Sequence, residues 1–263
     1  MFSTYSKSGG TARNPSMFWG DDTYSFYFPG GEFFTDFNYC LGGTTTMLDV
    51  GTDEMTFSLW FKWHDGHTEL NNGIFGVGSL FGHNMHMGFR SSDKKLVCRL
   101  YSGMSGLQII SSIDIDDTKW HHFCFAIDRE SPFMSKLYID GISRGASTTD
   151  TTSFDVDTGI LNVGSSPVYS GNDLGPAYIN DIAIWDVLLT QEDVAKIYNN
   201  GKPNDLTEAQ SYQSDKSSDL IVYWRMEEGT GDVVSDSSGN GYNLSRLSYS
   251  PTSDVAFSSE VPS

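Results

Sequence analysis

The 263-residue chain carries 34 acidic and 16 basic residues, which gives a net charge of −18 at pH 7. A surface of this charge repels the phosphates of nucleic acids and of anionic membranes, so neither is expected as a partner. Hydrophobic residues make up 38% and aromatic residues 14%, and 27 glycines are spread along the chain. This composition favours short strands and tight turns, as in a single β-sandwich.

The cysteines and the N-terminal sequence indicate where the chain is made. Cys40, Cys98 and Cys124 have no spacing typical of a metal site, and their odd number favours free thiols in a reducing compartment. The first residues contain no apolar leader, and no stretch approaches the length of a membrane span. We therefore expect synthesis in a cytoplasm without a signal peptide.

Residues 1–21 are predicted to form an extended N-terminal arm, followed by a single domain over residues 22–263 with a C-terminal tail. The arm is polar, and its few apolar residues cannot offset the entropy lost on ordering. We expect it to become ordered along a neighbouring chain, with Phe18 and Trp19 as the anchoring side chains.

From residue 24 onward, apolar and polar residues alternate in short runs separated by turn residues. A period of two places alternate side chains on opposite faces of a strand. The predicted strands cover residues 24–28, 55–62, 74–78, 85–89, 96–101, 107–113, 160–164, 177–185 and 220–226.

The clearest supersecondary signal lies in residues 120–145. Phe123, Phe125 and Ile127 alternate with smaller or polar residues, and Asp140-Gly141 is a strong signal for a two-residue type I′ turn. These features predict a three-strand antiparallel meander with one apolar face, which requires a second layer to cover it.

One helix is predicted near residues 190–199. Thr190 and Asp193 form a capping box, and Val194 and Ile197 begin an apolar stripe. The glycine at position 201 and the proline at 203 end it. No second hydrophobic core is expected.

Six motifs occur in an order that resembles laminin-G-like, concanavalin A-like jelly-roll domains over about residues 24–247. They are MTFSLWFK at 55–62, WHHF at 120–123, KLYIDG at 136–141, LNVG at 161–164, INDIAIWDVLLTQEDVAKIYNNG at 179–201 and YWRMEEGTGDVVSDSSGNGYNL at 223–244. The resemblance implies an all-β, antiparallel jelly-roll β-sandwich. It does not by itself imply one function, because this fold carries lectins, adhesion modules, hydrolases and virion proteins.

The stretch at 223–244 and the short Val-Pro tail look like those of jelly-roll domains in tailed-phage virion proteins. This likeness implies a virion structural protein, either a head decoration protein or a tail or fibre component. Its implied partners are other virion proteins, further copies of itself and host surface glycans. The alternative is a secreted or cell-surface carbohydrate-binding or adhesion module.

No catalytic constellation is found. Related jelly-roll glucanases carry two carboxylates in a Glu-x-Asp-x-x-Glu strand, and the sequence has no such pattern. Glu227 and Glu228 are adjacent, so on a strand they would point to opposite faces. A Gly-x-Ser-x-Gly elbow and a phosphate-binding loop are also absent from the sequence, and we expect no enzymatic activity.

The loop at 236–241 is a candidate calcium site. Carboxylate, amide and carbonyl oxygens in a glycine-rich turn are suitable calcium ligands, and Asp236 and Asn240 supply the side chains. The competing interpretation is that both residues satisfy backbone groups in a tight turn. Two His-x-x-His pairs, at 64/67 and 83/86, are a weaker zinc candidate.

A sugar site requires exposed aromatic rings beside polar groups. Trp63, Tyr169 and Tyr178 flank predicted loops and are the candidates for stacking on a saccharide. The other tryptophans considered, Trp60, Trp120, Trp185 and Trp224, are expected to fill the core.

Overall fold

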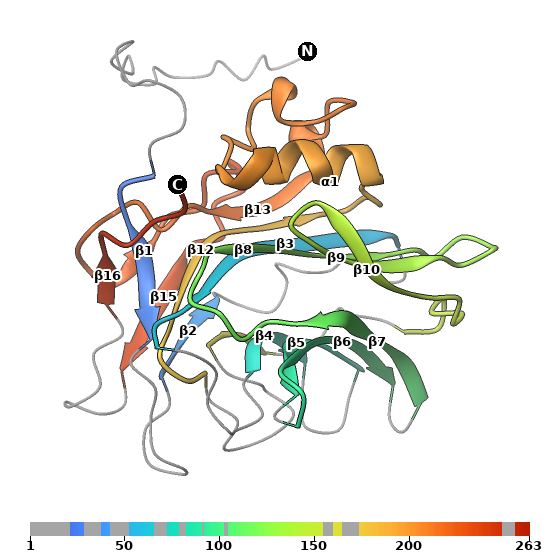
Figure 1. Cartoon of the computed structure of the whole chain (residues 1–263). Helices are drawn as coiled ribbons and strands as arrows, with labels where there is room; N and C mark the ends of the chain where they lie inside the picture. The colour runs from blue at the N-terminus through green and yellow to red at the C-terminus, as the bar shows by residue number, and fades with distance from the viewer. Residues whose placement is uncertain are drawn as a thin grey trace, which may run out of the picture.

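Two antiparallel β-sheets lie face to face, with a short helix packed on the outside of one of them (Figure 1). The structure is a computed structural model. It describes residues 22–28, 38–42, 53–65, 73–78, 83–90, 92–102, 105–154, 160–164, 174–248 and 256–263. This architecture confirms the predicted antiparallel jelly-roll sandwich. The predicted arm, with Phe18 and Trp19, lies outside the described residues.

The first sheet has the strand order β10-β9-β8-β3-β12-β1-β16, and β13 also pairs with β12. Its strands are β1 (Ser25–Phe28), β3 (Met55–Trp63), β8 (His121–Ile127), β9 (Ser135–Ile139), β10 (Ile142–Ser147), β12 (Ala177–Trp185), β13 (Leu220–Trp224) and β16 (Ala256–Ser258).

The second sheet has the order β14-β15-β2-β11-β4-β5-β6-β7. Its strands are β2 (Asn38–Gly42), β4 (Gly73–Gly78), β5 (His83–Arg90), β6 (Lys95–Ser102), β7 (Ser105–Asp114), β11 (Ile160–Val163), β14 (Val233–Val234) and β15 (Leu244–Ser248).

The predicted meander is present as β8, β9 and β10. Phe123 pairs with Ile139, and Phe125 pairs with Leu137, so the apolar side chains of both strands face the second sheet. Between β9 and β10, Asp140 and Gly141 have φ values of 53° and 73°. These left-handed conformations are the ones that a type I′ turn requires.

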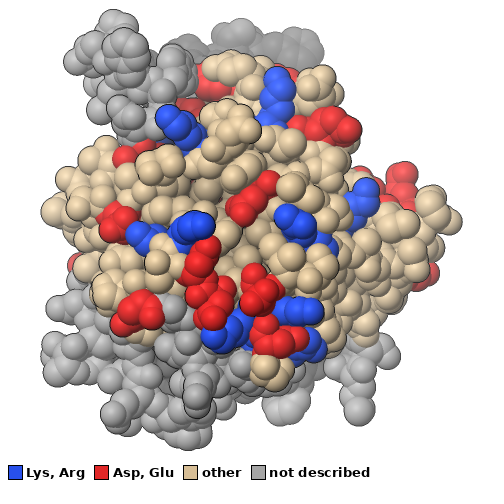
Figure 2. Space-filling view, in the orientation of Figure 1, with Lys and Arg blue, Asp and Glu red and all other residues tan. Residues whose placement is uncertain are grey.

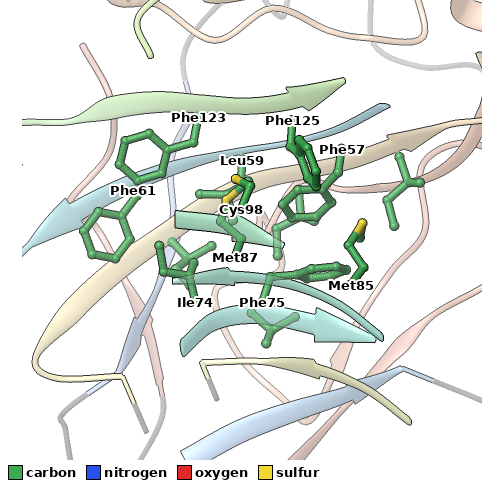
Figure 3. Packing of buried hydrophobic residues seen from close by; sticks show 14 of the residues in the cluster. Phe57, Leu59, Phe61, Ile74, Phe75, Met85, Met87, Cys98, Phe123 and Phe125 are labelled. Atoms are coloured by element: carbon green, nitrogen blue, oxygen red, sulfur yellow. The ribbon is translucent and has the colours of Figure 1, made fainter. Parts of the chain in front are cut away.

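Side chains from both sheets interdigitate in the core, as Figure 3 shows for residues of β3, β4, β5, β6 and β8. The rings of Phe57 and Phe75, from opposite sheets, stack with centroids 4.0 Å apart. Eight apolar residues of the first sheet are buried: Trp60, Phe123, Phe125, Leu137, Ile139, Ile182, Ile184 and Trp224.

A second, smaller apolar cluster lies on the outer face of the first sheet, under helix α1 (Gln191–Tyr198). Thr190 and Asp193 form the predicted capping box. Trp185 donates its indole N–H to the Tyr212 hydroxyl over 3.2 Å, which ties the sheet to the segment after the helix. The expectation of a single core was therefore incomplete: this half of the first sheet buries both faces.

Charged side chains are interspersed on the face of the molecule seen in Figure 2. Among the described residues there, acidic and basic groups lie next to one another rather than in one basic patch. Within the described parts of the chain, no helix has the length and apolar character needed to cross a bilayer.

Truncating Phe125, which is fully buried, to alanine should lower the free energy of unfolding by about 3–5 kcal/mol, because the cavity cannot close in a core packed from both sheets. Ile142→Ala is the control: this side chain is 52% exposed and should change stability by less than about 0.5 kcal/mol. Denaturant unfolding of both variants measures the difference. A loss below about 1 kcal/mol for Phe125→Ala would contradict its place in the core.

Candidate functional site

The outer face of the first sheet, turned away from the second sheet, is covered by α1 over only part of its area. Beyond the helix, Tyr27 of β1, Tyr178 of β12 and Lys62 of β3 form a cross-strand row. Their sequence neighbours, such as Phe26 and Phe61, belong to the core between the sheets. Strand alternation therefore turns the row outward.

Four aromatic side chains gather at this row. The Tyr27 and Tyr178 rings lie 5.0 Å apart, and the His64 ring lies 5.5 Å from Tyr27 and 5.7 Å from Tyr178. Trp120 adds a ring 6.3 Å from that of Tyr178. His64 is exposed and the other three are half-buried, so all four reach the surface. We call Tyr27, His64, Trp120 and Tyr178 the aromatic platform.

Charged groups border the platform. The Lys62 ammonium lies 5.7 Å from the centre of the Tyr178 ring and 2.7 Å from a carboxylate oxygen of Glu260, in the segment after β16. Partial burial and the nearby Glu260 and Asp65 carboxylates raise the pKa of Tyr178 above its usual value. The phenol is therefore protonated at neutral pH and can donate a hydrogen bond.

The three residues predicted to stack on a saccharide have different outcomes in the structure. Tyr178 lies on the platform. Trp63 does not: it is fully buried, and its indole N–H donates to the carbonyl oxygen of Ile115 over 3.2 Å. The prediction for Trp63 was wrong because alternation along β3 turns Lys62 outward and Trp63 into the core. Tyr169 lies outside the described residues.

Three members of the platform were missed by the sequence analysis. Trp120 was expected in the core, but it ends a loop just before β8 and is half-buried. Tyr27 sits in a strand whose alternation does mark it as outward, which was the available signal. Its proximity to Tyr178 depends on the pairing of β1 with β12, which joins residues about 150 positions apart and has no local signature.

The Asp236 carboxylate is held by four protein donors. Oδ1 accepts from the backbone N–H groups of Tyr223 (3.0 Å) and Ser238 (2.9 Å). Oδ2 accepts from the Ser238 hydroxyl (2.9 Å) and the Tyr242 N–H (3.0 Å). These contacts close the turn against β13.

The Asn240 side chain also forms hydrogen bonds with backbone groups. Its Nδ2 donates to the carbonyl oxygens of Leu220 and Ile221, both at 2.9 Å. The geometry at both residues thus favours the tight-turn interpretation, and calcium binding by Asp236 and Asn240 stays a prediction.

Among the described residues, the two histidine pairs do not come together. His64 follows β3 on the first sheet, whereas His86 is buried on β5 of the second. His67 and the side chain of His83 lie outside the described residues. No three His, Cys, Asp or Glu side chains within the described ranges are grouped to hold a metal ion.

His121 and His122, in the WHHF motif, have structural contacts. The two ring nitrogens of His121 contact carboxylate oxygens of Asp140 (2.7 Å) and Asp117 (2.8 Å). His122 packs 5.2 Å from the Trp60 ring. Complete burial lowers the pKa of His122 to about 4, so the imidazole is neutral at pH 7.

A laminin-G family model, described as the concanavalin A-like lectin/glucanases superfamily, matches residues 38–195. The chain belongs to this superfamily. No curated protein sequence matches it significantly.

Solved structures that share the fold include the following two. One is that of a proposed carbohydrate-binding protein from Bacteroides ovatus, with 15% identity, a TM-score of 0.59, and coverage of 91% of this chain and 61% of that one. The other is a heptameric SAP-like pentraxin from Limulus polyphemus, with 16% identity, a TM-score of 0.51, and coverage of 67% and 82%. The chain thus spans less than two thirds of the Bacteroides protein.

Asp236→Ala should lower the free energy of unfolding by roughly 2–4 kcal/mol, because four backbone and hydroxyl donors lose their acceptor. Melting curves with calcium and with EDTA measure the effect, and the loss should be equal in the two buffers. A loss confined to the calcium buffer would instead establish Asp236 as a calcium ligand.

Proposed function

We propose that the chain is a non-enzymatic binding module whose aromatic platform binds a saccharide. The observation that carries this proposal is the gathering of four rings on one outward-facing part of the first sheet. The membership in a superfamily that includes lectins supports it.

The platform has the chemistry that a sugar needs. The apolar C–H face of a pyranose packs on aromatic rings, and its hydroxyls require donors and acceptors nearby. The Tyr27 and Tyr178 hydroxyls, the Lys62 ammonium and the Glu260 carboxylate lie at or beside the rings. The net charge of −18 disfavours acidic sugars, so we propose a neutral saccharide.

The carboxylates considered for catalysis have other contacts. Both oxygens of Glu227 accept the Thr23 N–H, at 3.1 and 2.9 Å. Glu228 accepts the Ser235 N–H at 2.7 Å. These side chains hold loops in place, which supports a binding role without hydrolysis.

The proposed setting is the virion of a tailed phage, as a head decoration protein or a tail or fibre component. The likeness of residues 223–244 to domains of such proteins supports it. In that setting the other partners are further virion proteins and copies of the same chain, and the saccharide belongs to the host surface. The alternative is a secreted or cell-surface carbohydrate-binding module.

Tyr178→Ala should weaken binding of a neutral glycan at least tenfold, because it removes the ring that the other platform rings surround. A glycan array identifies the ligand and calorimetry measures its Kd. Tyr101→Ala, at a half-buried tyrosine of the second sheet, is the matched control and should leave Kd unchanged. Equal affinities for both variants, or no glycan bound by the wild type, would refute the platform.

Deleting residues 1–21 should leave the melting temperature nearly unchanged but reduce assembly onto particles, because the arm is expected to contact a neighbouring chain. A full-length variant with Phe18→Ala and Trp19→Ala tests the two proposed anchors separately. Sedimentation of variants with purified particles provides the measurement. Normal assembly of the truncated protein would contradict the role proposed for the arm.

A further inference from the structure

The segment after β16, residues 259–263, crosses the outer face of the first sheet. Ser258, the last residue of β16, pairs with Ser25 of β1 at the edge of the sheet. Glu260 nevertheless contacts Lys62 of β3, although β12 lies between β1 and β3. The segment therefore turns inward over β1 and β12, and Figure 1 shows its end on the side of the sheet that carries α1. We call residues 259–263 the strap.

Contacts on both sides of Glu260 hold the strap in this position. Before the strap, the Phe257 ring packs edge-on against the Phe26 ring of the core, with centroids 4.9 Å apart. At the bend, the Glu260 backbone N–H donates to the Ser258 hydroxyl over 3.2 Å. After the bend, Pro262 is buried. The position of Glu260 therefore depends on packing as well as on its ion pair.

The Lys62–Glu260 pair lies within the aromatic platform. Lys62 is paired with Tyr178, and its ammonium lies 5.7 Å from the centre of the Tyr178 ring. The pairing of β3 with β8 begins at His121, so Trp120, the residue before it, lies on the other side of Lys62. The Lys62 side chain is 18% exposed and that of Glu260 is 47% exposed. A ligand on the rings therefore meets the carboxylate before it meets the ammonium.

The charges at the platform are unfavourable for an acidic ligand. Among the described residues, Glu260 is the only hydrogen-bond partner of the Lys62 ammonium, at 2.7 Å. Burial and the charge of Asp65 raise the pKa of Tyr27, so a second carboxylate borders the rings. An acidic sugar would therefore face two carboxylates and an ammonium that is already neutralised. These groups act at contact distance, whereas the net charge of the chain acts over longer distances and is screened by salt.

A neutral saccharide finds complementary groups at the same pair. An ammonium carries several N–H donors, so Lys62 can donate to a hydroxyl oxygen while it remains paired with Glu260. A carboxylate accepts at several lone pairs, so Glu260 can also accept a hydrogen bond from a hydroxyl. A donor and an acceptor held side by side match adjacent hydroxyls of a pyranose, because each hydroxyl both donates and accepts.

We propose that Glu260 is the specificity-determining residue of the aromatic platform. By pairing with the Lys62 ammonium, it makes the platform accept neutral saccharides and reject their acidic counterparts. Removing the Glu260 carboxylate leaves Lys62 free beside the Tyr178 ring, where it pairs with the carboxylate of a uronic or sialic acid. This inference rests on the proposed saccharide-binding function and names the group that sets its charge preference.

The test uses the full-length protein on an array in which each neutral glycan is accompanied by its sialylated or uronic-acid counterpart. Calorimetry then measures Kd for the pair of glycans that binds most strongly. The wild type should bind the neutral member at least about tenfold more tightly than the acidic one. In Glu260→Gln, which keeps the shape of the side chain, this ratio should shift at least about tenfold toward the acidic member, because Lys62 gains a charge-assisted contact.

Two further variants separate the pair from the overall charge. Asp219→Asn also removes one negative charge, from an ion pair with Lys216 (3.6 Å) directly before β13, beside the end of β12 that is remote from Tyr178. It should leave the ratio of affinities unchanged. Adding Lys62→Met to Glu260→Gln should abolish the gain in affinity for the acidic glycan. A cooperative melt verifies that each variant is folded.

The outcomes distinguish a failure of this inference from a failure of the proposed function. If the wild type binds no glycan, or if Tyr178→Ala leaves binding unchanged, both fail. If the wild type binds glycans through Tyr178 but Glu260→Gln keeps the wild-type ratio, only the role of Glu260 is refuted. An equal shift in Asp219→Asn would assign the preference to overall charge, and a gain that persists without the Lys62 ammonium would assign it to another group. Either result would overturn the proposal.

Discussion

The structure depends on the second half of β12 being buried on both faces. Ile179, Ile182 and Ile184 enter the core between the sheets, while Ala183 and Trp185 enter the cluster beneath α1. The strand is paired with β3 along one edge and with both β1 and β13 along the other. Burial on two faces and pairing on two edges leave β12 one possible register, because a slip of one residue would exchange the two apolar sets.

The same register determines which side chains of β12 reach the outer surface of the first sheet. Helix α1 covers one half of β12, so Ala183 and Trp185 are hidden, whereas Tyr178 lies beyond the helix and stays accessible. β1 and β3 bring Tyr27 and Lys62 to either side of it. The platform is therefore a consequence of how far α1 extends along the strand, and a longer helical layer would have buried it.

The features that the sequence predicts correctly are those determined by residues close together in the chain. The Asp140-Gly141 turn, the Thr190 cap and the alternation around Phe125 each rest on residues within a few positions of one another, and the structure confirms them. The site depends on pairings between distant segments. The burial of Trp63 follows from the alternation along β3. Nothing near Trp120 indicates which way its ring faces, because a tryptophan flanking a strand fits a core or a surface equally well.

The irregular segment of β12 could not be predicted for a related reason. Asn180-Asp181 interrupts an apolar run, which by itself is compatible with a turn, an exposed edge or a buried polar site. Only the convergence of β1 and β13 on that point removes water from Asp181 and gathers further carboxylates around it. Exposed acids such as Asp53 and Asp150 are hydrated and cost little, whereas a buried acid at this junction requires compensation by hydrogen bonds or a positive charge. Asn180 is two residues from Tyr178 on the same face of β12. The contacts that hold the irregular segment at Asn180-Asp181 in place therefore also position the backbone that carries the aromatic platform.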